Sequence, residues 1–370
     1  MARKRATDLS KTDMTMLVLI VLLVIFGLAV LFSSSEYNGR VRFGDSACYF
    51  KKQLFATALG MGVMYMVSSI DYHFFLRLGP VAYLISMFLS GAVLFVGQEI
   101  NGSKRWLNLG PLSFQPSEFA KVAVILFLAW QIERTKKATM GFGFMCRTIL
   151  TLLPIIGLVG SNNLSTAIIV MAITVLLLFL VHPKTKRFVV FACVVLVLAV
   201  IVVVYLKIQI SDMATSTDFR MRRIIAWLNP EANSDKDSYQ FLQGLYAIGS
   251  GGFFGKGLGN STQKLSAIPE AQNDMILTVI CEELGVFGAI LILCLFGFML
   301  YRLMFIARNA PDLYGSLIAA GIFSHIALQV ILNIAVVTGL IPTTGVTLPF
   351  ISYGGTAVVF LLAEMGIALG

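Results

Sequence analysis

Charged residues are scarce in this 370-residue chain: they make up 13% of it, whereas hydrophobic residues make up 58%. A soluble domain carries about 25% charged residues. This shortage excludes an ordinary soluble globular protein. Runs of about 20 apolar residues recur along the chain, and such runs are long enough to cross a bilayer as helices. The sequence therefore predicts an integral membrane protein.

Histidine and cysteine are also scarce, with three and five residues. The cysteines form no CxxC pair, and no group of histidines, cysteines or carboxylates has the spacing of metal ligands. We therefore expect neither a disulfide framework nor a protein-held metal. The basic start, residues 3–5, leads into an apolar run that is too long for the core of a cleavable signal peptide.

The apolar segments predict an all-α polytopic membrane protein with about ten transmembrane helices and no need for strands. We interpret residues 1–370 as a single membrane domain. A long polar stretch, residues 207–274, separates the seventh and eighth segments and is expected to form a large loop. The predicted spans are residues 14–33, 51–70, 79–97, 116–132, 148–161, 165–182, 187–206, 275–301, 314–340 and 353–369.

Lysine and arginine are distributed unevenly between the two sides of this topology. The positive-inside rule places the more basic side, and with it both termini, in the cytoplasm. Long loops are not counted by that rule, so helix parity places residues 207–274 on the outside. The net charge of +9 accordingly reports orientation and contact with anionic lipid, and not binding of nucleic acid. The basic side carries Arg3, Lys4, Arg5, Lys11, Arg77, Arg134, Lys136, Lys137, Arg147, Lys184, Lys186, Arg187, Arg302 and Arg308.

The long loop contains two expected helices and a glycine-rich run. Residues 221–228 place apolar side chains on one helical face, with Arg220, Arg222 and Arg223 interleaved, which is typical of a basic amphipathic helix on a membrane surface. Residues 238–248 are expected to form a second short helix. The run at 249–259 is interpreted as a hinge, because no strand precedes it as a phosphate-binding loop requires. Lys256 within it remains a candidate phosphate contact.

The loop ends in two acidic residues, Glu270 and Asp274, which share a face if that turn is helical. They are candidates for substrate binding and for catalysis, respectively. The alternative for Asp274 is an acidic residue that stabilises the start of the next helix. Glu282 and Glu283 lie about two turns further on and are expected to pair with Lys121 or with another buried cation.

Three more polar motifs occur at helix ends. In residues 101–110, Lys104 and Arg105 are candidate phosphate contacts and Trp106 a candidate sugar contact, although an interfacial tryptophan with solvated cations is favoured on the residues alone. Glu118 and Lys121 are three residues apart and can pair on one helix face, in a functional or a structural role.

The third motif, residues 342–356, holds Ser352, a candidate substrate contact; its prolines and glycines predict a re-entrant or tight outer loop. His325 and Gln329 lie one turn apart in the ninth predicted span. They are expected to form hydrogen bonds between helices.

Taken in order, these motifs resemble the SEDS family (shape, elongation, division and sporulation), the bacterial peptidoglycan glycosyltransferases typified by FtsW and RodA. The resemblance rests on residues 101–110, 115–121, 255–264, 269–285 and 345–355. The last three blocks are more similar to the division and sporulation branch than to the elongation branch. Two departures occur. The family's Thr-Asp-Phe is Asn273, Asp274 and Met275 here, and its Pro-Asp-Leu-Gly-Thr is represented by residues 162–166, where the carboxylate is absent.

The resemblance implies polymerisation of lipid II into β-1,4 glycan at the outer face of the bacterial cytoplasmic membrane, with inversion at the anomeric carbon. Asp274 is then the base, and Glu118, Lys121 and Glu282 are supporting residues. It also implies lipid II, a class B penicillin-binding protein and divisome or elongation-complex proteins as partners, with Mg²⁺ possible on the pyrophosphate of the substrate. The expected leaving-group contacts are Arg220, Arg222, Lys104, Arg105 and Lys256.

Two other functions are considered. A lipid II flippase would suit the charges predicted within the spans, such as Glu118 and Glu364. No inverted repeat is visible, however, and the ionisable residues gather toward the outer face. A non-enzymatic scaffold that recruits the transpeptidase would leave Asp274 without a role.

Overall fold

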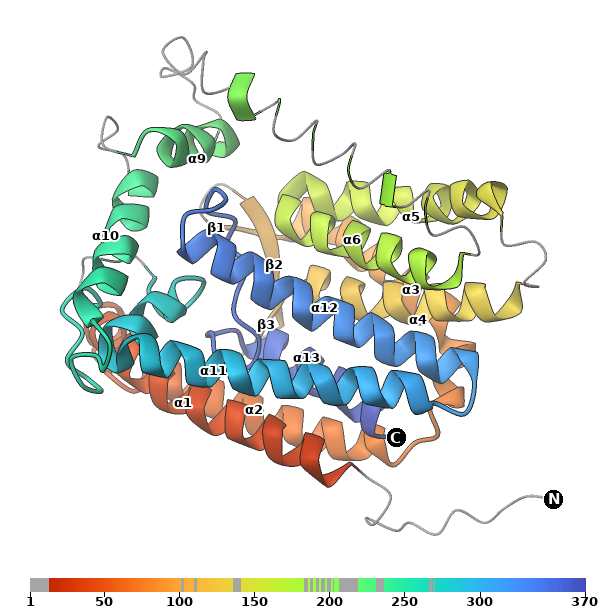
Figure 1. Cartoon of the computed structure of the whole chain (residues 1–370), viewed down its shortest axis with the longest axis horizontal. Helices are drawn as coiled ribbons and strands as arrows, with labels where there is room; N and C mark the ends of the chain where they lie inside the picture. The colour runs from red at the N-terminus through yellow and green to blue at the C-terminus, as the bar shows by residue number, and fades with distance from the viewer. Residues whose placement is uncertain are drawn as a thin grey trace.

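The computed structural model forms an elongated bundle of roughly parallel and antiparallel helices (Figure 1). Its first helix begins and its last helix ends at the same end of the bundle, called here the termini end. The opposite end, called the site end, carries three short strands and the beginning of α11. The structure describes residues 13–100, 103–109, 112–135, 141–182, 186, 189–190, 193, 197, 201, 203–205, 219–230, 236–265, 268 and 270–370.

The predicted spans coincide with helices, apart from the seventh, residues 187–206, most of which lies outside the described residues. Among the described residues, six helices are long and apolar enough to cross a membrane: α1, α3, α5, α6, α11 and α12. The predicted class, a multi-pass helical membrane protein, is confirmed, whereas the count of ten spans remains a prediction. The helices are α1 (Met14–Phe43), α2 (Cys48–Ser68), α3 (His73–Val96), α4 (Pro116–Arg134), α5 (Phe142–Asn162), α6 (Leu164–Val181), α9 (Phe219–Leu228), α10 (Lys236–Gly251), α11 (Ile276–Asn309), α12 (Leu313–Val337) and α13 (Gly355–Leu369).

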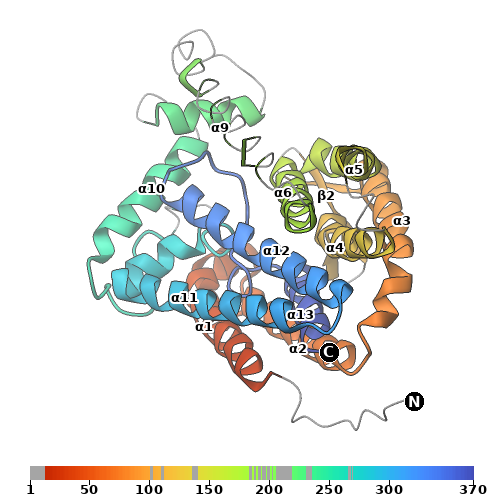
Figure 2. The ribbon, with the colours of Figure 1, turned by 45° about the vertical axis from the view of Figure 1, so that its right-hand side comes forward.

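The bundle has two groups of helices with α12 between them (Figure 2). Helices α3 to α6 form one group, and α1, α2, α11 and α13 form the other, in which α13 packs along α2. Large apolar side chains such as Phe88 and Phe95 are exposed on the outside of the bundle, whereas carboxylates such as Glu283 and Glu364 are buried inside it. This distribution suits a lipid surround, where a charge must face the protein interior.

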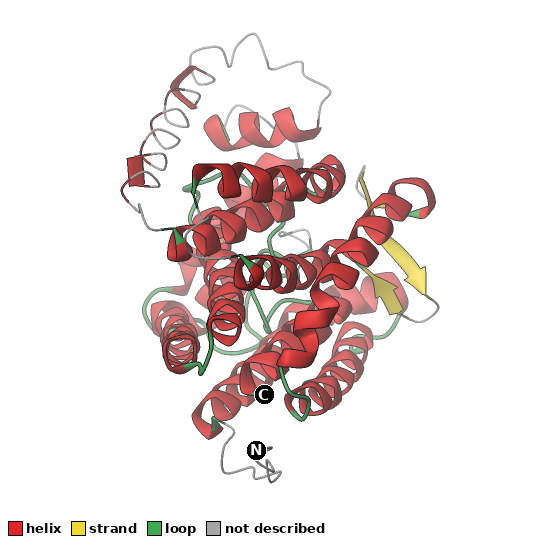
Figure 3. Ribbon diagram, turned by 90° about the vertical axis from the view of Figure 1, so that its right-hand side faces the viewer, coloured by secondary structure: helices red, strands yellow, loops and turns green. Residues whose placement is uncertain are grey.

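A small antiparallel sheet, not expected from the sequence, lies at the site end (Figure 3). It consists of β1 (Gln98–Ile100), β2 (Ser103–Leu109) and β3 (Leu112–Phe114). Gln98 pairs with Trp106, and Leu107 pairs with Phe114. The expectation of no strands was wrong here. Apolar residues alternate over short stretches of this loop, and its backbone N–H and C=O groups form hydrogen bonds between its own strands and not within a helix.

Helix α11 is interrupted at Gly285, which has a φ of +68° and a ψ of −167°. The glycine-rich segment that follows α10 fills the gap. Lys256 N donates to Glu282 O and Gly257 N to Glu283 O, while Val286 N donates back to Gly252 O. The broken helix thus exchanges its lost internal bonds for bonds to the segment beside it, as buried backbone groups require. The predicted hinge is therefore a packed connection to α11.

Replacing Gly285 with alanine is expected to destabilise the fold by several kcal/mol, since the position needs a positive φ and has no room. A Cβ atom at Gly285 would lie 2.4 Å from Gly255 N and 2.4 Å from Phe253 O. The matched control is Gly297→Ala in the same helix, where a Cβ meets nothing within 4 Å. Thermal melting in detergent measures both variants. Equal melting temperatures would contradict the constraint on Gly285.

Candidate functional site

Asp274 lies in the turn that precedes α11, at the meeting point of three segments. The side-chain amide of Asn333, in α12, donates 2.8 Å hydrogen bonds both to Asp274 O and to Val346 O. A Cβ atom on Gly345 would lie 3.9 Å from Asp274 Oδ2. The carboxylate therefore faces the irregular loop before α13, and Asn333 holds the turn and the loop in register.

The structure gives Asp274 no capping role. The N-cap residue of α11 is Met275, and no side chain forms a capping hydrogen bond at that position. An acidic N-cap would accept a hydrogen bond from an amide in the first turn. The geometry therefore shows no capping hydrogen bond from this acid, and the remaining structural role is the interaction of its charge with the positive end of α11.

The electrostatic surroundings of Asp274 come from distant parts of the chain. Burial raises the pKa of its carboxyl group above the usual value, and the nearby charge of Glu270 raises it further. Arg223 and Arg105 act in the opposite direction and lower the pKa. The pKa of this carboxyl group is thus raised by burial and lowered by two guanidinium groups. Such opposing effects are typical of a residue that takes up a proton during a reaction.

The two arginines reach this region from separate elements. Arg223, on α9, donates from Nη1 to Thr343 O at 3.3 Å, so it contacts the same loop that Asp274 faces. Arg105, on β2, donates from Nε to Asn162 O at 2.8 Å. The predicted basic helix is present as α9, but the side chains of Arg220 and Arg222 lie outside the described part of the structure.

Glu270 does not share a helical face with Asp274. Its φ of +51° breaks the helical path, and residues 270–275 form turns. The carboxylate instead accepts a 2.7 Å hydrogen bond from Asn273 Nδ2 and forms a 3.4 Å salt bridge with Arg42 of α1. The two acids are close enough for Glu270 to influence the pKa of Asp274. It is Asp274 that lies beside Gly345, in the irregular loop before α13, called here the 345 loop.

The outer motif with Lys104, Arg105 and Trp106 forms β2. Side chains alternate along a strand, so Lys104 and Trp106 share one face and Arg105 points to the other. Asn162, at the end of α5, forms two hydrogen bonds with this strand. Its side-chain Nδ2 donates to Lys104 O at 2.8 Å, and its backbone carbonyl accepts from Arg105 Nε. Asn163, where the family pattern has an acid, caps α6 by accepting from Thr166 N at 3.2 Å.

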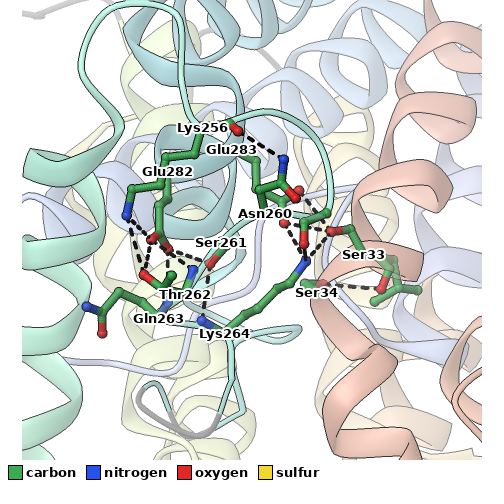
Figure 4. A network of polar contacts seen from close by, with 12 residues as sticks. Ser33, Ser34, Lys256, Asn260, Ser261, Thr262, Gln263, Lys264, Glu282 and Glu283 are labelled. Carbon is green, nitrogen blue, oxygen red and sulfur yellow. Dashed lines mark hydrogen bonds and ion pairs between the residues drawn. The ribbon is translucent and has the colours of Figure 1, made fainter.

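Lys256 and Glu282 form an ion pair, which meets the second of the two alternatives left open for Glu282. Lys256 Nζ lies 2.7 Å from Glu282 Oε1, so Glu282 pairs with this lysine and not with Lys121. Figure 4 shows the network that surrounds the pair. Glu282 also accepts from Ser261 Oγ and from the amide of Thr262. Lys256 is therefore engaged within the protein at the place where a phosphate contact was predicted.

A second ion pair in the same network joins Glu283 to Lys264, a buried cation that the sequence analysis did not name. Lys264 Nζ lies 2.7 Å from Glu283 Oε1, and Ser33 of α1 binds both groups at 2.8 and 2.7 Å (Figure 4). The sequence predicted a buried cation for Glu283, but its signal for Lys264 was only the position of that residue in the 255–264 block. Ser33 carried no signal, because a serine in an apolar helix has many uses.

Glu118 and Lys121 form the predicted pair. Lys121 Nζ lies 2.8 Å from Glu118 Oε2, and the two side chains are 1% and 9% exposed. His325 likewise makes an interhelical contact, 2.8 Å from Glu364 Oε2. Ser352 is buried, and its hydroxyl accepts from Leu348 N at 2.8 Å.

Fold and site together define a multi-pass helical membrane protein with a half-buried carboxylate beside an irregular loop and within electrostatic reach of two arginines. Residues 13–370 match the model of the cell cycle protein family FtsW/RodA/SpoVE, and the chain belongs to this family. The predicted resemblance is thus confirmed. The chain is 36% identical to stage V sporulation protein E of Bacillus subtilis over 98% of this chain and 97% of that protein. It is 34% identical to the probable peptidoglycan glycosyltransferase FtsW of Trichlorobacter lovleyi, over 98% and 93%.

Solved structures agree with this assignment. One chain of a peptidoglycan synthase complex, described as coordinating polymerization and crosslinking, superposes with a TM-score of 0.78 at 27% identity and covers 97% of this chain and 96% of that one. The rod shape determining protein RodA of Thermus thermophilus superposes with a TM-score of 0.68 at 26% identity, over 97% and 95%.

Removing one member of the Glu118–Lys121 pair is expected to destabilise the protein by about 3–5 kcal/mol, because the other charge is then stranded in the interior. Glu118→Ala and Lys121→Met are measured singly and together by thermal or chemical unfolding in detergent. The double variant is expected to regain much of the loss. Strictly additive effects would contradict direct pairing in the folded protein.

Proposed function

We propose that this chain is a peptidoglycan glycosyltransferase that polymerises lipid II, with Asp274 as the base. One observation carries the proposal: Asp274 is a half-buried carboxylate with a raised pKa beside the 345 loop, and two arginines from α9 and β2 act on it. The names of the relatives and the match to a peptidoglycan synthase complex support the same class of reaction.

The reaction has simple requirements. The acceptor is the 4-hydroxyl of a sugar, and Asp274 removes its proton as the oxygen attacks the anomeric carbon of the donor. A new carbon–oxygen bond forms on the face opposite the leaving group, the bond to the pyrophosphate oxygen breaks, and undecaprenyl pyrophosphate departs. The configuration is therefore inverted, giving a β-1,4 linkage.

The departing pyrophosphate carries negative charge that cations at the site end can stabilise. Arg105 and Lys104 on β2 and Arg220 and Arg222 on α9 are the proposed contacts, with Trp106 against a sugar ring. The predicted substrate contacts Glu270 and Ser352 are instead assigned to holding the segments around Asp274, because Glu270 pairs with Arg42 and Ser352 accepts from Leu348 N. Since Lys256 pairs with Glu282, we assign it to holding the loop on α11 and not to the leaving group.

The proposed partner is a class B penicillin-binding protein that crosslinks the glycan, within a divisome or an elongation complex. The structural match to a synthase complex that combines polymerization and crosslinking supports this. Matches to SpoVE and FtsW proteins support the division or sporulation branch. The single membrane domain and the outer 207–274 loop remain parts of the proposal, as does the location in the cytoplasmic membrane.

Asp274→Asn is expected to lower glycan synthesis by about 10²–10⁴-fold, because an amide keeps the size of the side chain but accepts no proton. The assay is glycan formation from purified lipid II by the protein with its transpeptidase partner, next to a lipid II binding measurement and a melting curve. Folding and binding are expected to remain.

The matched control is Asp45→Asn, the same chemical change at an exposed carboxylate that pairs with Lys51 between α1 and α2. It is expected to leave synthesis unchanged. Near-normal synthesis by the Asp274 variant would remove this residue from the mechanism. A flippase would move lipid II across vesicle membranes and form no glycan, whichever residue stands at 274.

The pH dependence of turnover offers a second measurement. The base acts in its deprotonated form, so turnover falls as the pH drops through the pKa of Asp274. Because burial raises this pKa, the fall is expected at a higher pH than for an ordinary aspartate. Arg223→Gln removes a charge that lowers this pKa, so the acid limb of the profile is expected to move to higher pH. Arg308→Gln, at an exposed residue at the end of α11, is the control. An unmoved acid limb for the Arg223 variant would contradict the assignment.

Orientation is tested by cysteine labelling in a cysteine-free background. A cysteine at Ser113, on β3, is expected to react with a membrane-impermeant maleimide in intact cells, whereas one at Gly141, before α5, is expected to react only after permeabilisation. Both positions are exposed. Reversed labelling would place the proposed active site in the cytoplasm and overturn the proposal.

A further inference from the structure

A concave site lies at the termini end of the bundle, far from Asp274. It is a cavity of about 670 Å³ between the last turns of α4 and the first turns of α5, within the size range of small-ligand pockets. Its polar and aromatic lining includes Trp130, Gln131, Arg134, Thr135 and Arg147. Nothing in the proposed reaction uses these residues.

Two guanidinium groups, those of Arg134 and Arg147, line the cavity. Arg134 lies over the ring of Trp130, 5.0 Å from its centre. Arg147 faces the cavity from the second turn of α5. Within the described residues neither arginine forms a salt bridge. Arg134 is nevertheless near enough to Glu133 for its positive charge to lower the pKa of that carboxyl group. Two exposed arginines around one hollow are suited to an anion.

Two further groups suit a phosphate with hydroxyl substituents. Gly143 lines the cavity in the first turn of α5, so the positive end of that helix faces it. The oxygen Oε1 of Gln131 is buried without a hydrogen-bond partner among the described residues. Gln131 lines the cavity, and a side-chain amide is suited to hydrogen bonding with a hydroxyl group of a ligand.

Apolar surface continues directly from the cavity along α5. Leu150, one turn beyond Arg147, is 66% exposed, and Leu153 is 47% exposed. Most of α5 in its membrane-crossing window is not covered by the protein. A ligand with a phosphate at Arg147 and acyl chains beside Leu150 would satisfy both surfaces, and an aromatic residue such as Trp130 is typical of the membrane interface.

We propose that this cavity binds the head group of an anionic phospholipid, with its phosphodiester between Arg134 and Arg147 and a head-group hydroxyl on Gln131. Basic pockets between transmembrane helices are suited to such head groups. Phosphatidylglycerol is the probe of this chemistry. The proposal is independent of the glycosyltransferase reaction.

The test counts bound lipids on delipidated full-length protein by native mass spectrometry, during titration with dioleoyl phosphatidylglycerol or dioleoyl phosphatidylcholine. The unmodified protein is expected to bind one phosphatidylglycerol in preference to phosphatidylcholine. The double variant Arg134→Gln with Arg147→Gln is expected to bind that lipid about tenfold more weakly. Arg147→Gln alone gives a smaller loss, and both variants are expected to melt as the parent does, because the replaced side chains are exposed.

The matched control is Arg77→Gln with Arg308→Gln, two exposed arginines at the same end of the bundle that do not line the cavity. It changes the net charge equally and is expected to keep the preferred lipid. Equal losses in the two double variants would overturn the proposal, because the effect would then be general charge. Equal binding of phosphatidylcholine, or displacement of the lipid by soluble glycerol 3-phosphate, would also overturn it, the latter in favour of a water-soluble phosphate.

Discussion

The arrangement of the site end depends on the buried ion pair between Lys264 and Glu283, together with its neighbour Lys256–Glu282. A carboxylate inside a low-dielectric bundle is tolerated only with a cation and hydrogen bonds around it. These pairs lie where α11 is broken at Gly285, so they hold residues 256–264 on the broken helix. Ser33 extends the network to α1. Asp274 lies between this anchored segment and α11, so its position follows from the same contacts.

The requirement that buried backbone groups be paired explains the rest of the site. Irregular backbone within a membrane protein is tolerated where protein surrounds it or where it lines a cavity. Asn333 meets this need for both the Asp274 turn and the loop at Val346, and Tyr353 N donates to Gln272 O at 2.9 Å. The carboxylate of Asp274 thus lies beside an irregular loop whose backbone is fixed by hydrogen bonds to the neighbouring segments.

Much of the fold and part of the site was predictable. Apolar runs located the long helices that the structure describes, because a bilayer demands about 20 apolar residues per helix whatever the neighbouring helices are. The spacing of Glu118 and Lys121 predicted their contact, since i,i+3 residues adjoin on any helix. The strands around Trp106 and the partner of Lys256 were not predictable. Both depend on which distant segment lies alongside, and local periodicity carries no such information.

The sequence by itself determined a multi-pass membrane protein, its family and the acid at position 274, because hydropathy and ordered motifs are properties of the chain alone. Only the tertiary structure decided what surrounds that acid. Arg105 and Arg223 reach it from elements far apart in the sequence, and Glu270 turns away to Arg42 through a positive φ. The pKa of a carboxylate is set by burial and by charges close in space, and folding alone brings those charges together.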